Sequence, residues 1–253
     1  MQTLMLNSTS RWPWIMMVLR TILFATFQAA IAGVFLIQDV ASPWDASAGW
    51  WPITASLGSF VTIALLVWLY HQEGRRYWNL LRFRRETLGA DVLTSLGILV
   101  ITIPVAMLPN VLLARGLFGD QQIALDLLIR PLPMWAVALS LTLFPISIAL
   151  SELPNYFGYI LPRLEAQTKR PWLVVGLTSF WLAAQHICLP FLPDARFMIW
   201  RLVMFMPFAI LLAVILRWRS RLLPYLVIIH GLLDFSTALL VLFVSKGISL
   251  GVN

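Results

Sequence analysis

Long apolar stretches dominate this chain and restrict it to the few architectures that a lipid bilayer allows. A helix needs about 20 apolar residues to cross the hydrocarbon core. Seven stretches qualify, over residues 14–37, 50–70, 92–114, 133–161, 171–192, 198–216 and 222–245. Backbone polar groups inside a bilayer must be paired within the protein. The sequence therefore predicts an all-α, polytopic membrane helix bundle with about seven transmembrane helices.

The composition supports a single domain embedded in the lipid bilayer. Of the 253 residues, 60% are hydrophobic and 11% are charged, whereas soluble domains carry about 25% charged residues. No repeat or linker divides the chain, so we expect one transmembrane domain over residues 1–253. The stretch 14–37 is too long for the apolar region of a signal peptide and is expected to be an uncleaved span.

The basic residues predict an orientation. The net charge of +7 could suggest nucleic acid, but most basic residues lie in short loops on one side, so no nucleic-acid partner is expected. These residues are Arg11, Arg75, Arg76, Arg82, Arg84, Arg85, Arg163, Lys169, Arg170, Arg217, Arg219 and Arg221. The positive-inside rule then predicts a multi-pass protein of a bacterial plasma membrane, with a cytoplasmic N-terminus and an external C-terminus. Arg20, inside the first span, is expected to snorkel. The loop 71–91 is expected to form an interfacial amphipathic helix.

Four ionisable residues lie inside the apolar stretches: Glu152, His186, His230 and Asp234. A charged side chain at the bilayer centre costs about 2.5–3.5 kcal/mol on insertion scales. The helical rise of about 1.5 Å per residue allows all four to meet at a similar depth, near the midplane or in its cytoplasmic half. His230 and Asp234 are four residues apart and share one helix face.

Such a set supports hydrolytic chemistry. Two imidazoles and a carboxylate can hold a divalent metal such as zinc, with a position open for water. A further carboxylate can accept the proton of that water as a general base. The same residues could polarise a water without metal. Each residue alone is equally well explained by packing or local pairing, but one shared cavity explains all four.

Three segments together resemble the CPBP family, the CAAX-protease and bacteriocin-processing intramembrane metalloproteases. The first is Glu152-Leu-Pro-Asn-Tyr-Phe-Gly-Tyr-Ile-Leu-Pro-Arg-Leu164, where the family has Glu-Glu-x-x-x-Arg-Gly, often followed by Leu-Pro-Arg-Leu. The second, Leu182-Ala-Ala-Gln-His186, matches an aromatic residue, three residues and a histidine. The third, His230-Gly-Leu-Leu-Asp234, matches His-x-x-x-Asn/Asp. The resemblance covers residues 145–240, the expected catalytic core.

The chain departs from the family pattern at three positions. Leu153 replaces the second glutamate, and Phe157 replaces the motif arginine. Their joint loss suits an ion pair replaced by an apolar contact. Leu182 replaces the aromatic residue. A one-residue shift would put Ser151 on the first glutamate, but it breaks the match at Gly158.

The resemblance implies hydrolysis of a peptide bond within the membrane, in a membrane-associated peptide or protein. Glu152, with His186, would activate water. His230 and Asp234 would bind the metal or stabilise the tetrahedral oxyanion, and the implied metal ligands are His186, His230 and Asp234.

Three other functions stay open on the sequence. The losses at Leu153 and Phe157 suit a catalytically inactive CPBP-like scaffold or a bacteriocin-immunity protein. A transporter or proton relay could use Glu152 and Asp234, although the chain lacks the internal repeats common in transporters. A bis-histidine haem b site could use His186 and His230.

Overall fold

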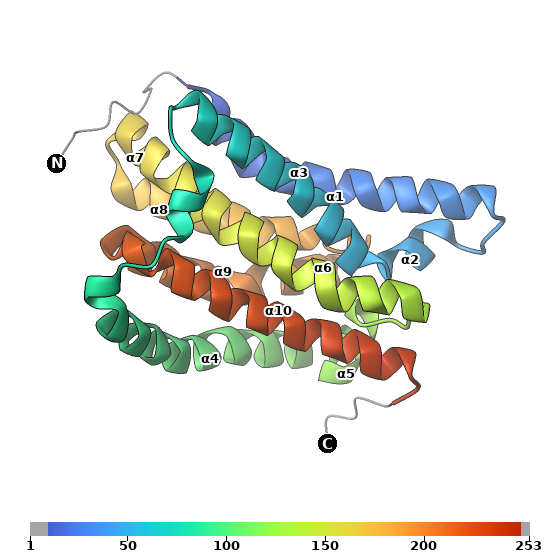
Figure 1. Cartoon of the computed structure of the whole chain (residues 1–253). Coiled ribbons are helices and arrows are strands. Elements are labelled where there is room, and N and C mark those ends of the chain that lie inside the picture. Colours follow the sequence, from blue (N-terminus) through green and yellow to red (C-terminus); the bar gives the residue numbers. More distant parts are fainter. Residues whose placement is uncertain (1–9, 249–253) are drawn as a thin grey trace.

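The structure, a computed structural model, describes residues 10–248 as a bundle of helices (Figure 1). The described residues contain no named strand, which confirms the predicted all-α fold. The α-helices are α1 (Trp12–Ile37), α2 (Pro43–Ala48), α3 (Trp51–Gln72), α4 (Leu88–Phe118), α5 (Gln121–Leu128), α6 (Met134–Leu153), α7 (Leu161–Thr168), α8 (Pro171–Ala184), α9 (Ala195–Trp218) and α10 (Leu223–Ser245). The 3-10 helices are η1 (Tyr77–Leu81), η2 (Arg85–Thr87), η4 (Gln185–Ile187) and η5 (Ser220–Leu222), and η3 (Pro154–Ile160) is a π-helix.

Six helical segments of the described chain are long and apolar enough to cross a membrane. They are Trp12–Ile37, Trp51–Gln72, Tyr77–Phe118, Met134–Thr168, Ala195–Trp218 and Ser220–Ser245. This finding confirms the prediction of an integral, multi-pass membrane protein. The predicted cytoplasmic side of its N-terminus stays a prediction.

The fifth predicted span, 171–192, is shorter than expected. Its helix α8 has only 14 residues, which extend about 21 Å at the usual helical rise. The chain then makes the single turn η4 and continues without helix to Asp194. Pro190 has no amide hydrogen to continue a helical ladder. The non-helical backbone is instead bonded within the bundle, because Gln28 pairs with both the N–H and the carbonyl of Phe191.

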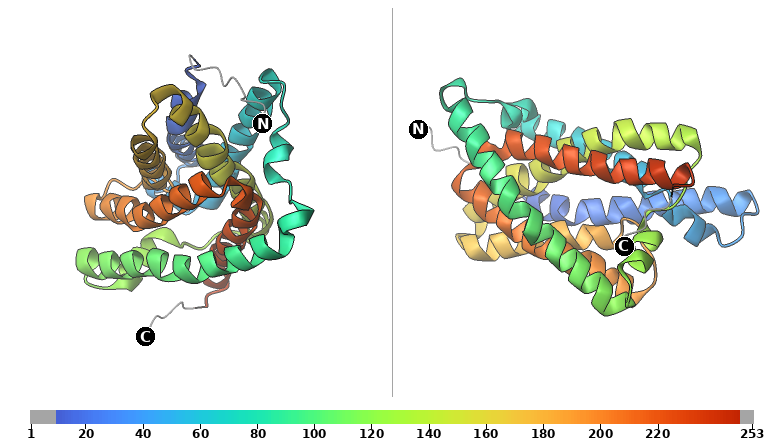
Figure 2. Two further views of the ribbon diagram at one scale, coloured as in Figure 1. Left: turned by 90° about the vertical axis from the view of Figure 1, so that its left-hand side faces the viewer. Right: turned by 90° about the horizontal axis from the view of Figure 1, so that it is seen from below.

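The chain runs back and forth along the bundle, and the short helix α8 is part of one of these passes. In Figure 1, α1 begins at the end of the bundle where α7 lies, and α10 ends at the opposite end. Seen along its length, the bundle wraps α1, α3, α6, α8, α9 and α10 around a common interior, and α4 closes one side (Figure 2). The segment after α8 therefore completes a pass that the helix alone does not.

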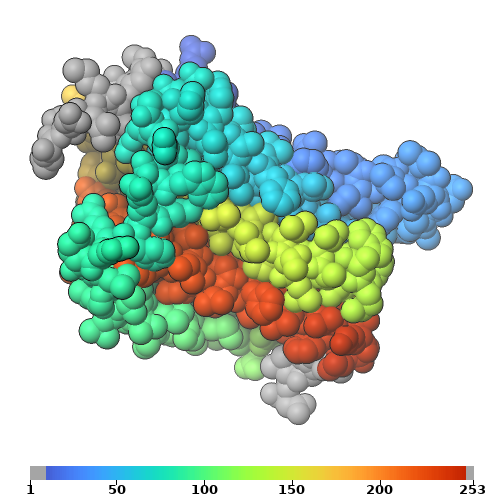
Figure 3. Space-filling model, in the orientation of Figure 1, coloured from blue at the N-terminus to red at the C-terminus, as the bar shows by residue number. Residues whose placement is uncertain are grey.

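The loop 71–91 does not form the amphipathic helix that its composition predicts. It folds as η1 and η2, joined by extended backbone at Arg82 and Arg84. The side chain of Tyr77 is buried and donates its hydroxyl to the carbonyl of Leu150 in α6. This tertiary contact draws the segment into the bundle, and Figure 3 shows it lying over the ends of α3 and α10.

A π-helical turn follows α6 and bears on the site. Pro154 begins η3. A π-turn holds one residue more than an α-turn and is frequent at functional sites. The turn is fixed by long-range contacts: Tyr156 donates to the carbonyls of Met17 and Trp181, and Asn155 donates to Met16. Glu152 therefore lies in the last turn of α6, directly before a firmly packed break.

Candidate active site

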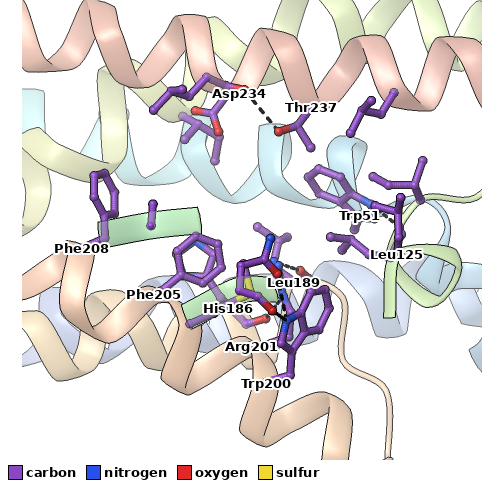
Figure 4. Close-up of a pocket in the computed structure, with 18 of the residues that line it drawn as sticks. Trp51, Leu125, His186, Leu189, Trp200, Arg201, Phe205, Phe208, Asp234 and Thr237 are labelled. Atoms are coloured by element: carbon purple, nitrogen blue, oxygen red, sulfur yellow. Dashed lines mark hydrogen bonds between the residues drawn. The ribbon is translucent and has the colours of Figure 1, made fainter. Parts of the chain in front are cut away.

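One cavity of about 280 Å³ lies inside the bundle and is lined by all four predicted site residues. Glu152 comes from α6, His186 from η4, and His230 and Asp234 from α10. Most of the remaining wall is apolar, with aromatic rings from α3 and α9. Figure 4 shows Asp234 on one side of this space, with His186 and Arg201 on the other.

Glu152 is 2% exposed, and the two oxygens of its carboxylate have different surroundings. Its Oε2 accepts a hydrogen bond from Gln185 Nε2 at 2.8 Å and lies 3.5 Å from Arg20 Nη2. Its Oε1 has no hydrogen-bond partner among residues 10–248. Oε2 is therefore held by hydrogen bonds, whereas Oε1 forms none and lies 3.2 Å from His230 Nε2.

Arg20 does not snorkel, and that prediction is wrong. The side chain is completely buried. Its Nε donates to Gln185 Oε1 at 2.6 Å, and its Nη1 donates to Ser151 Oγ at 2.7 Å and lies 3.5 Å from Ser59 Oγ. Together with its pairing to Glu152, these contacts join α1, α3, α6 and η4 at one point. A buried ion pair needs such additional hydrogen bonds to offset the cost of removing both charges from water.

His230 lies between the two carboxylates. Its Nε2 is 3.2 Å from Glu152 Oε1 and 3.5 Å from Asp234 Oδ2. Both are ion-pair distances for a protonated imidazole, and none of the three atoms forms a hydrogen bond within the described residues. The His230 Nδ1 atom also has no partner there. Buried polar atoms in proteins normally have a partner, so such a cluster suits a bound polar group.

His186 occupies the opposite wall and has a defined tautomer. Its Nδ1 lies 2.9 Å from the carbonyl oxygen of Leu182. A carbonyl can only accept, so Nδ1 carries the proton and Nε2 carries the lone pair. The ring stacks on Phe205 with centroids 3.6 Å apart. His186 is therefore fixed as a hydrogen-bond acceptor.

The predicted residues thus fall into a close group and one more distant member. His230 lies within 3.5 Å of both Glu152 and Asp234, whereas His186 lies on the side of the cavity opposite Asp234 (Figure 4). Within residues 10–248, no group of three or more His, Cys, Asp and Glu side chains is placed to hold a metal ion. The donor types suit zinc, but the described arrangement does not gather His186, His230 and Asp234 around one point. A metal at this site stays a prediction.

Sequence reasoning missed Arg20 and Gln185. Arg20 lies eight residues into α1, about 12 Å from its start at the usual rise, which is deep for a residue assigned to the interface. Gln185 directly precedes His186 and is fully buried. Their depth within an apolar span could have identified both residues, because polar groups at such depth usually face the bundle interior.

Leu153 and Phe157 are both buried in one hydrophobic cluster. The cation beside Glu152 is Arg20 of α1. No protein-family model, curated protein or solved structure matches this chain.

Proposed function

We propose that this protein is an intramembrane endopeptidase of the CPBP type, hydrolysing a membrane-associated peptide or protein. The observation that carries the proposal is a cluster of buried polar atoms, beside one cavity, that form no hydrogen bond among residues 10–248. These atoms are Glu152 Oε1, His230 Nδ1, His230 Nε2 and Asp234 Oδ2. Polar atoms left unpaired in an apolar interior lower stability, so their retention favours a role in chemistry.

Glu152 is suited to act as the general base. Gln185 and Arg20 hold Oε2, so the carboxylate cannot rotate freely, and Oε1 is left to accept a proton. A base must reach the water that it deprotonates within hydrogen-bonding distance. His186 presents an Nε2 lone pair from the opposite wall, which can accept the second hydrogen of the same water.

His230 is suited to stabilise the oxyanion of the tetrahedral intermediate. Its Nε2 lies beside two carboxylate oxygens, which favour a proton on that nitrogen. A positioned N–H donor in a site without bulk water stabilises developing negative charge strongly. Asp234, one helical turn from His230, orients the imidazole.

The cavity also suits a substrate that arrives from the lipid. Met107 of α4 and Leu233 of α10 line it, and their side chains are 53% and 40% exposed. Asp234 keeps 17% of its side chain exposed. Because these side chains are not packed over by others, we expect the substrate to enter between α4 and α10.

A non-catalytic membrane scaffold is the second candidate, and one contact favours it. The ion pair of Glu152 with Arg20 gives the glutamate a structural role that needs no chemistry. In this case the site would keep its fold but hydrolyse nothing.

The experiment is hydrolysis of a panel of membrane-anchored, fluorescence-quenched peptides by protein reconstituted into vesicles. Glu152→Gln and His186→Ala should each abolish cleavage, because each loses an acceptor for the water protons. The matched control is Glu165→Gln, a glutamate paired with Arg217 away from the cavity, which should cleave at the wild-type rate. Cleavage by folded Glu152→Gln at the wild-type rate would exclude the mechanism and favour the scaffold.

A further inference from the structure

Arg201 of α9 is a second buried arginine, and the proposed mechanism does not use it. It is 4% exposed and lines the same cavity as Glu152 and His230. Its Nε donates to the carbonyl of His186 at 3.3 Å, and its Nη2 donates to the carbonyl of Leu189 at 2.9 Å. The guanidinium is therefore held at the wall of the cavity by backbone carbonyls of η4 and of the non-helical segment that follows it.

Its charge has no counterion among the described residues. No carboxylate of residues 10–248 forms an ion pair with Arg201, whereas the buried arginines Arg20 and Arg163 pair with Glu152 and Glu73. The ring of Phe205 lies 5.0 Å from the Arg201 guanidinium, and the ring of Trp200 lies 5.6 Å away. Aromatic faces attract a cation, but they do not neutralise it. A buried cation without an anion is costly.

The contacts leave one edge of the guanidinium free. The two carbonyls occupy the edge formed by Nε and Nη2. The other edge, between Nη1 and Nη2, has no acceptor among residues 10–248. Two parallel N–H groups on such an edge match the two oxygens of a carboxylate. Figure 4 shows Arg201 beside His186 at the cavity, between Trp200 and Phe205.

We infer that Arg201 binds the carboxylate of a ligand whose apolar portion fills this cavity. The Arg201 charge favours an anionic ligand, and the free edge of the guanidinium fits a carboxylate. The cavity walls, which include Leu125, Met204 and Phe208, fit an apolar chain. A peptide ending in apolar residues and a fatty acid both present this chemistry. Arg201 then positions the ligand relative to Glu152, and this step rests on the proposed function.

The test measures binding, so it does not depend on hydrolysis. Two pairs of probes are titrated into the protein in detergent micelles: dansyl-aminoundecanoic acid with its primary amide, and dansyl-tetraleucine with a free or an amidated C-terminus. We expect at least one carboxylate to bind about tenfold or more tightly than its amide, since hydrogen bonds to a charged group are stronger than neutral ones. The pair that shows this preference identifies the source of the carboxylate. Equal binding of acid and amide in both pairs would overturn the inference without any variant.

Variants then assign the preference to Arg201. Arg201→Gln should bind acid and amide equally, and Arg201→Lys should keep part of the preference, because it retains the charge but not the paired donors. The matched control is Arg196→Gln on the same helix, an exposed arginine paired with Asp194, which should bind as the wild type does. A preference that persists in folded Arg201→Gln would place the anion elsewhere.

The two proposals can fail separately. Glu152→Gln should lose hydrolysis and still prefer the carboxylate, because Glu152 forms no ion pair with Arg201. Hydrolysis that depends on Glu152 without any acid preference would overturn the role of Arg201 alone. An acid preference that depends on Arg201, together with wild-type hydrolysis in Glu152→Gln, would overturn the proposed mechanism alone.

Discussion

Arg20 Nη2 lies 3.5 Å from Glu152 Oε2, and both side chains are buried in the interior of the bundle. The first helix thereby contributes to a site whose other members all come from the second half of the chain. Gln185 strengthens the link, because it accepts from Arg20 and donates to Glu152. This pairing makes the fold of α1 and the orientation of the proposed base depend on each other.

The stability contributions of Arg20 and Glu152 should depend on each other. Arg20→Met leaves the Glu152 carboxylate buried and unpaired, and breaking a buried pair in this way costs about 3–5 kcal/mol. Arg20→Met with Glu152→Gln should cost less than the sum of the two single changes. Thermal unfolding midpoints in detergent measure the three variants. Arg11→Met, at an exposed position before α1, is the control. Additive losses would show that the two residues do not interact.

A second prediction concerns the close approach of α6 and α10. A Cβ atom added at Gly231 would lie 3.1 Å from Ala149 Cβ and 3.6 Å from the carbonyl oxygen of Pro145. Gly231→Leu must therefore move α10 away from α6 and separate His230 from Glu152. We expect peptide hydrolysis to fall by about a hundredfold, the effect of a displacement of about 1 Å in an active site.

The matched control is Gly176→Leu, on the exposed face of α8. A Cβ atom there meets no atom within 4 Å, so hydrolysis should match the wild type. Unchanged hydrolysis in folded Gly231→Leu would show that the His230–Glu152 spacing is unimportant.

Hydropathy alone gives most of the fold, because the bilayer requires each apolar stretch to be a helix. It fails where tertiary contacts replace helical bonds. The backbone after α8 leaves the helix because Gln28 and Trp44, both distant in sequence, satisfy the polar groups of Phe191. Tyr77 likewise draws the loop 71–91 into the bundle through Leu150.

Helical spacing and depth in the apolar stretches predict part of the candidate site. The four-residue spacing places His230 and Asp234 on one face, and their depth brings them level with Glu152. No local pattern shows which residue of another helix faces them. The contributions of Arg20 and Arg201 are therefore visible only once α1 and α9 are packed against the site. Their depth in apolar spans indicates only that each charge faces other polar groups.

Asparagine and alanine substitutions distinguish two roles of Asp234, orienting His230 and supplying negative charge. Its Oδ2 lies 3.5 Å from His230 Nε2, and the carboxylate is partly exposed. If the side chain mainly orients the imidazole, an amide oxygen can replace it. Asp234→Asn should then hydrolyse peptides within about tenfold of the wild type, whereas Asp234→Ala should lose about a hundredfold, in the range of lost orienting partners. Initial rates on one cleaved peptide compare the two, with Ser236→Ala, on the exposed side of α10, as the control. Equal losses in both Asp234 variants would instead assign the negative charge itself to the reaction.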